Sequence, residues 1–250
     1  MNTSSNSVMS VHPATQKLCA WGGPVLVVTM FIGWGLVGGF IPLPAPTNSP
    51  EEVARFFSDN ALRIRVGLLI CMFGSPFLGL WVAALTVQIK RIEGPVSPLA
   101  YAQLALGAAA IVEFLTPLAI WGAVAYRPEE GPLITYRLND VAWILWLAVG
   151  QSIVLQAVVF GYAILKDKRA TPIFPRWLAY FNFWCATLFL PSGLCMFFKT
   201  GPFAWNGVIA WWVVAIAYAV WLSVIAVVIH YRAVPGHEDE VANPLGFQTR

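Results

Sequence analysis

Residues 99–126 read LAYAQLALGAAAIVEFLTPLAIWGAVAY, a stretch that contains one formally charged side chain. An α-helix rises 1.5 Å per residue, so about 20 apolar residues cross the roughly 30 Å of hydrocarbon in a bilayer. This stretch is therefore long and apolar enough to span a membrane. Five more stretches satisfy the same criterion, namely 18–41, 66–89, 141–165, 177–198 and 208–231.

The composition excludes a soluble globular protein. Hydrophobic residues make up 58% of the 250 residues, charged residues make up only 11%, and the mean hydropathy is +0.70. Soluble domains carry about 25% charged residues. We predict an all-α integral membrane protein with six transmembrane helices. Residues 1–17 would form a polar cytoplasmic leader, 18–232 the membrane domain and 233–250 a flexible cytoplasmic tail.

The basic residues indicate the orientation. With both termini in the cytoplasm, nine of the fifteen Lys and Arg residues lie on the cytoplasmic side and six lie outside. Such an excess is typical of cytoplasmic loops, and KDKRATPIFPR (residues 166–176) contributes most to it. We predict cytoplasmic N- and C-termini and a multi-pass location in the cell membrane, which is the inner membrane if the source is bacterial.

The first outer connection contains a helix signal of its own, SPEEVARFFSDN at residues 49–60. Ser49 as N-cap, Pro50 at the first helical position and Glu52 three residues after Ser49 form a capping box. The apolar residues that follow have helical spacing. We predict a short amphipathic helix near 50–60 on the outer membrane surface, and a break near residues 58–60 before the second span.

Three spans contain an internal proline, and polar side chains occur at similar depth. Pro76, Pro117 and Pro191 lie about 11–15 Å inside the proposed outer ends, where each frees a backbone carbonyl and favours a kink. Freed carbonyls in hydrocarbon need a partner or a hydrated cavity. We predict helix breaks at these prolines and a ligand or proton site nearby, formed by Glu113, Thr116, Gln151, Gln156 and Tyr218. The alternative is that these polar side chains only hold helices together.

Glu113 is the strongest candidate because it is the one formally charged residue deep within a span. Placing an ionised carboxylate at that depth costs about 3 kcal/mol on insertion scales. The carboxyl group is therefore either protonated and bonded to an acceptor such as Gln156, or ionised in a hydrated pocket. We predict that Glu113 anchors the site. A neutral acid that bonds neighbouring helices remains the alternative.

Tryptophan is abundant and one-sided. Of the twelve tryptophans, seven fall toward the proposed outer side: Trp34, Trp121, Trp143, Trp146, Trp205, Trp211 and Trp212. An interfacial belt accounts for some of them, but a belt would be symmetric. The excess indicates an aromatic cavity for an apolar or cationic ligand. We predict a pocket rim of Trp121, Trp143, Arg127, Arg137 and Asp140, with capping of the fourth span as the alternative role of Asp140.

Signatures of cofactor chemistry are not found. The three histidines, His12, His230 and His237, lie outside the deep part of the spans, so a membrane haem and a di-iron site are not predicted. The four cysteines lack paired C-x-x-C spacing, which argues against a zinc site or a disulfide framework. No nucleotide-binding or hydrolase motif occurs. We expect no cofactor, no metal, no catalytic residue and no nucleic-acid partner.

These observations favour a multi-pass membrane protein with an outward-facing pocket. The pocket would bind, carry or gate a small apolar molecule or a proton, in the manner of a transporter, with Glu113 as its anchor. A non-catalytic subunit of a larger membrane complex, with another membrane protein as partner, is the first alternative. A membrane enzyme acting on a lipid-like substrate is the second. In each case the lipid bilayer is the surrounding partner.

Overall fold

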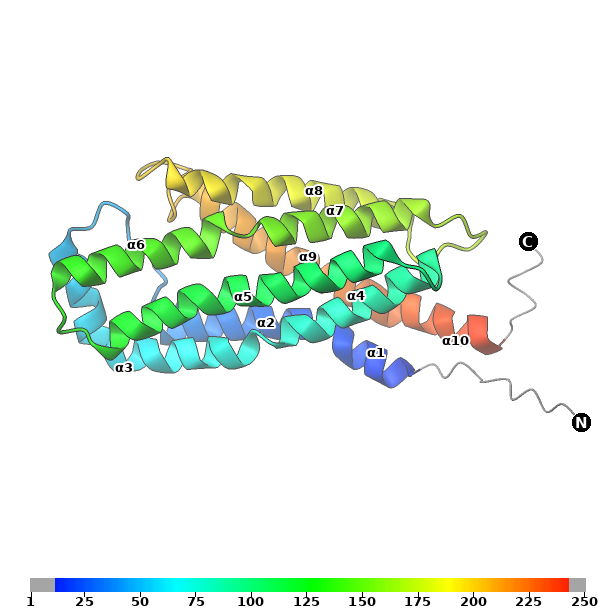
Figure 1. Ribbon diagram of the computed structural model, residues 1–250, viewed down its shortest axis with the longest axis horizontal. Helices are drawn as coiled ribbons and strands as arrows, with labels where there is room; N and C mark the ends of the chain where they lie inside the picture. Colours follow the sequence, from blue (N-terminus) through cyan, green and yellow to red (C-terminus); the bar gives the residue numbers. More distant parts are fainter. Residues whose placement is uncertain (1–11, 243–250) are drawn as a thin grey trace, which may run out of the picture.

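The computed structural model describes residues 12–242, and all regular structure within this range is helical. Six helices are long and apolar enough to cross a membrane, spanning Pro13–Val37, Pro50–Glu93, Pro98–Tyr126, Pro132–Lys166, Arg176–Met196 and Val208–Val241. The prediction of an all-α, six-span membrane protein is therefore confirmed. Figure 1 shows the spans as an elongated bundle with neighbouring spans running in opposite directions.

Most spans are not single regular α-helices. In the first half of the chain the elements are α1 (Pro13–Ala20), α2 (Gly22–Met30), the π-helix η1 (Phe31–Val37), α3 (Pro50–Gly74), α4 (Phe77–Glu93) and α5 (Pro98–Tyr126). In the second half they are α6 (Pro132–Ala148), α7 (Gln151–Lys166), α8 (Arg176–Phe189), the 3-10 helix η2 (Leu190–Met196), the π-helix η3 (Val208–Val213), α9 (Val214–Val228), the π-helix η4 (Ile229–Ala233) and α10 (Val234–Ala242).

The two ends of the bundle differ. The helices α1 and α10 lie together at one end, here called the terminal end, and α3 begins at the opposite end, here called the loop end (Figure 1). The first span packs against the second and, through α1 and α2, against the sixth. The third span lies between the second and the fourth, and the fifth joins the fourth to the sixth. Spans one, two, four, five and six thus surround a common interior.

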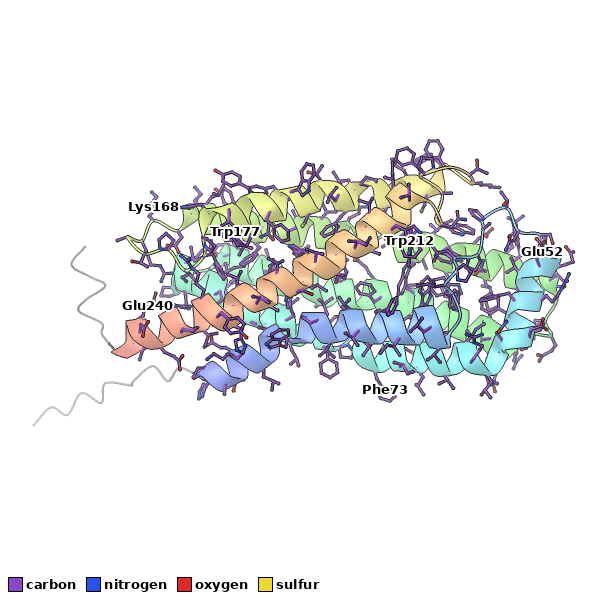
Figure 2. All side chains as sticks on the ribbon, turned by 180° about the vertical axis from the view of Figure 1, so that it is seen from behind. Glu52, Phe73, Lys168, Trp177, Trp212 and Glu240 are labelled. Carbon is purple, nitrogen blue, oxygen red and sulfur yellow. The ribbon has the colours of Figure 1, made fainter. Side chains whose placement is uncertain are left out.

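The capping box at the start of α3 is confirmed. The Ser49 N–H donates to the carboxylate of Glu52 at 2.7 Å, and the Glu52 N–H donates to the Ser49 hydroxyl at 3.2 Å. The predicted break near residues 58–60 is wrong, because α3 continues as one helix from Pro50 to Gly74. Its first turns, which carry Glu52, cross the loop end before the helix turns along the bundle (Figure 2).

The direction of α3 changes where side chains bond to its own backbone. The Ser58 hydroxyl donates to the carbonyl of Arg55 at 3.1 Å, and the Asn60 amide donates to the carbonyl of Phe56 at 2.8 Å. Bonds of this kind compete with the helix ladder and bend helices. The polar segment therefore bends α3 without interrupting it.

Two further expectations about boundaries need correction. The fourth span begins at Pro132, where proline occupies the first helical position, so Asp140 lies inside α6 and not at its N-cap. Residues 234–242, which were expected to be part of a flexible tail, form α10. Residues 243–250, and residues 1–11 of the predicted leader, lie outside the described range.

An ion network fixes α10 to the terminal end. Glu240 accepts from Arg91 at 2.9 Å and from Arg169 at 2.7 Å, so it joins the second span to the connection between the fourth and fifth spans. Arg169 also pairs with the buried Asp167 at 3.2 Å. Arg176 donates to the last carbonyls of α7, including that of Ile164 at 2.8 Å. Basic side chains predicted as cytoplasmic thus bond to helix ends and acids in this network.

Close helix approach fixes the first span against the second. A Cβ atom added at Gly67 would meet the carbonyl oxygen of Gly33, and a Cβ atom at Gly33 would meet the carbonyl oxygen of Gly67 at 2.6 Å. The backbones of η1 and α3 therefore touch, as small residues allow in membrane helices. This contact positions η1, which forms part of the site described below.

We expect Gly67→Ala to destabilise the protein by about 1–3 kcal/mol, because the added methyl group clashes with backbone and not with a movable side chain. The measurement is the thermal unfolding midpoint in mild detergent. Gly122→Ala in α5 is the matched control, because the nearest heavy atom to its new Cβ would be 4.0 Å away. Equal midpoints for the two variants would contradict the close-contact interpretation.

Candidate functional site

A cavity of about 340 Å³ lies between the spans in the half of the bundle nearer the loop end. Its wall comes from α2 and η1 on one side and from η3 and α9 on the other, with α5, the α6–α7 junction and the α8–η2 junction behind them. Eight of the twenty lining residues are aromatic: Phe31, Trp34, Phe114, Trp146, Phe189, Trp211, Trp212 and Tyr218. The volume lies within the range of small-molecule sites, about 300–1,000 Å³.

Trp34 organises the aromatic wall. Its ring centroid lies 4.8 Å from that of Trp211, 5.6 Å from that of Trp146 and 4.9 Å from that of Phe40. Trp34 is only 3% exposed, and Phe40 is fully buried. These rings close the cavity toward the loop end. Offset and edge-to-face contacts of this kind contribute about 0.5–1.5 kcal/mol each beyond area burial, so the wall is a well-ordered surface.

Two hydroxyl groups belong to the otherwise apolar lining. Ser192 is buried, and its hydroxyl donates to the carbonyl of Phe189 at 2.8 Å. The Tyr218 hydroxyl is buried and has no hydrogen-bond partner among the described residues. The Tyr218 ring packs against Phe114, with the two ring centroids 5.8 Å apart. Charged side chains are absent from the lining that the structure describes.

The fourth span is interrupted at Gly150, which lines the cavity. The break leaves carbonyl groups at the end of α6 and N–H groups at the start of α7 without helical partners. The Gln151 amide donates to the carbonyl of Ala148 at 3.1 Å and so caps α6. Sequence reasoning did not predict this break, although the 35-residue apolar segment is longer than a single crossing needs.

Glu113 contacts the start of α7, on the other side of the same break. The hydroxyl of Ser152, the second residue of α7, donates to a carboxylate oxygen of Glu113 at 2.6 Å. Helix N-termini carry a partial positive charge and stabilise anions. Glu113 therefore bonds α5 to the first turn of α7, beside the N-terminus of that helix, and it does not line the cavity.

The other predicted site residues are dispersed. Thr116 is exposed, and its hydroxyl donates to the carbonyl of Val112 in its own helix at 2.8 Å. Gln156 is buried and accepts from the amide of Gln103 at 3.0 Å, so it bonds α7 to α5 and not to Glu113. Of the residues predicted for the site or its rim, all of which are described, Tyr218 alone lines the cavity.

The residues predicted for the rim do not line this cavity. Trp121 and Trp143 are fully buried beside Trp34, and the Trp121 indole N–H donates to the Asn139 side chain at 3.0 Å. The charged members lie elsewhere on the loop half. Arg127 is exposed and pairs with Glu130 at 3.4 Å, Arg137 is exposed beside Tyr136 at 5.8 Å, and Asp140 lies near the charges of Arg137 and Lys199.

The three prolines have different effects. Pro76 separates α3 from α4, and Pro191 lies where α8 gives way to the 3-10 helix η2. Pro117 lies inside α5, which continues through it from Pro98 to Tyr126, so the helix break predicted there does not occur. Pro191 is next to Ser192 and so adjoins the cavity, whereas neither Pro76 nor Pro117 is part of its lining.

Comparison with protein-family models, with curated proteins and with solved structures gives no match for this chain. The site is therefore interpreted from its own geometry and chemistry.

We expect Glu113→Leu to lower stability by about 1–3 kcal/mol, because the Ser152 hydroxyl and the start of α7 lose their acceptor. Glu113→Gln retains an acceptor oxygen and should stay closer to wild type. Thermal unfolding in detergent, combined with Ser152→Ala in a double-mutant cycle, measures the coupling. Additive effects of Glu113→Leu and Ser152→Ala would contradict a stabilising bond between these two side chains.

Proposed function

We propose that this multi-pass membrane protein binds a small, mostly apolar molecule in the cavity between its first, third, fourth, fifth and sixth spans. The observation that carries the proposal is the lining itself, which combines an ordered aromatic wall with two hydroxyl groups and no charged side chain among the described residues. Pockets of this composition favour apolar ligands with one or two groups that accept or donate hydrogen bonds.

The two hydroxyl groups supply the polar part of the recognition. The Tyr218 hydroxyl is buried without a protein partner, and an unsatisfied buried hydroxyl costs about 1–3 kcal/mol. A ligand oxygen or a water molecule that reaches it would recover this energy. In this proposal Glu113 is a positioning residue: by accepting from the Ser152 hydroxyl it fixes the first turn of α7 and so the Gly150 junction, which forms part of the wall.

A proton pathway through Glu113 receives less support. The Glu113 carboxylate already accepts a hydrogen bond from Ser152 at the start of α7. In the described lining of the cavity, Tyr218 is the one titratable side chain. Binding of an apolar molecule would involve the whole lining of the cavity, whereas a proton relay would involve only Glu113 and Tyr218.

The proposal is tested with protein reconstituted in lipid vesicles and a long-chain alcohol that carries a diazirine and an alkyne handle. After illumination, we expect cross-links in η1, η3 and α9, and excess unlabelled alcohol should suppress them. Ala215→Trp fills part of the cavity and should remove most of this competable labelling.

Ala119→Trp is the matched control, because Ala119 is exposed on α5 and does not line the cavity. It should label as the wild type does. If cavity peptides label no more than the lipid-facing helices, or if Ala215→Trp and Ala119→Trp behave alike, the proposed function is wrong.

A further inference from the structure

We infer that the ligand reaches the cavity sideways from the bilayer, through a portal between the first and sixth spans, and that it is a membrane-dissolved molecule with a hydrocarbon chain. This inference rests on the proposed function and adds a route and a substrate class to it. It also replaces the outward-facing aqueous mouth expected from the sequence. The observations that support it are the exposure of the lining, the path of the two spans and the closure at the loop end.

The cavity wall reaches the outer surface of the bundle at three residues. Phe31 of η1 is 55% exposed, Trp212 of η3 is 39% exposed and Ile216 of α9 is 60% exposed, although all three line the cavity. All three have large hydrophobic side chains, and they come from the apolar first and sixth spans. A surface opening bordered by such side chains faces hydrocarbon and not water.

The paths of the two spans explain the opening. Near the terminal end α1 and α2 contact α9, η4 and α10, so the first and sixth spans are closed there. Toward the loop end the sixth span diverges from the first, and Trp212 lies near the loop-end limit of the sixth span, past the point where the two separate (Figure 2). The contact between Trp34 and Trp211, at 4.8 Å, bridges the spans again beyond this point. The portal therefore has a closed boundary on both sides along the membrane normal.

The aqueous route at the loop end is blocked by the same tryptophans. Trp34 and Trp211 are 3% and 7% exposed, and Trp143 behind them is fully buried and stacks on Trp205 at 5.6 Å. A water-soluble ligand would have to displace this cluster. A molecule already dissolved in the bilayer needs to move only the exposed side chains of Phe31, Trp212 and Ile216. The favoured ligand is thus a chain-bearing lipid with a small polar group.

The test measures the rate of competable cross-linking with the same diazirine alcohol, by flash illumination at increasing times after its addition to proteoliposomes. We expect the rate to follow the alcohol concentration in the bilayer when the lipid-to-protein ratio is varied at constant total alcohol. Ile216→Trp narrows the portal and should slow loading several-fold. Val220→Trp, one turn away at an exposed position outside the lining, should load at the wild-type rate.

A second pair of variants tests the portal in the opposite direction. Phe31→Ala widens it and should speed loading, while Phe73→Ala, at an exposed phenylalanine outside the lining (Figure 2), should not. If Ile216→Trp does not fold, the comparison of Phe31→Ala with Phe73→Ala tests the lateral route by itself. Competable labelling at equal rates within each pair would overturn the lateral route and leave the proposed function intact. Absence of competable labelling in the wild type would overturn the proposed function itself.

Discussion

The structure depends on one constraint: a backbone polar group in hydrocarbon must find its partner within the protein. A regular helix satisfies the constraint by itself, but an interrupted helix does not. At Gly150 the fourth span stops and restarts, and two side chains bond to the groups beside the break: the Gln151 amide donates to the carbonyl of Ala148, and Glu113 accepts from the hydroxyl of Ser152 in the first turn of α7. The intramembrane acid thus has a partner at this junction, and the partial positive charge of a helix N-terminus stabilises a carboxylate beside it.

Irregular helix segments and the cavity coincide. The lining draws on the π-helices η1 and η3, the Gly150 junction and the 3-10 helix η2, where four of the spans depart from the α-helix; the junctions at Trp21 and Pro76 and the π-helix η4 lie outside it. Such departures change the direction of a helix and the spacing of its side chains. Neighbouring spans therefore cannot interdigitate as regular helices do, and large aromatic side chains occupy part of the space between them. The same departures let the sixth span diverge from the first and open the portal.

The sequence predicts features that depend on local spacing. Six apolar stretches, the capping box of Ser49 and Glu52, and an excess of tryptophan on one side all follow from residue type and order. Four of the seven tryptophans singled out do line a cavity: Trp34, Trp146, Trp211 and Trp212. Features that depend on side-chain direction did not follow. Trp121 and Trp143 have the composition of a rim, but their helices turn them into the packed cluster around Trp34.

The sequence did not indicate which side chains of different spans bond to each other. Gln156 and Ser152 share a face of α7, yet Glu113 bonds only to Ser152, which lies nearer the break. Gln156 accepts a hydrogen bond from Gln103 instead. Pro117 suggested a break in α5 because proline lacks an N–H group, but a membrane helix tolerates that loss where neighbours support it, and α5 packs on spans two and four. Gly150, which carries no such signal, holds the real break.

The bilayer also affects the free-energy cost of such a cavity. Apolar space left by truncated side chains in soluble cores costs about 24 cal/mol per Å³. On that scale the space here corresponds to about 8 kcal/mol, which is comparable with the whole net stability of a domain, about 5–15 kcal/mol. A cavity closed to hydrocarbon would be strongly disfavoured. One that opens between Phe31 and Ile216 is in contact with a reservoir of lipid chains that fill it, so the lateral portal and the size of the cavity require each other.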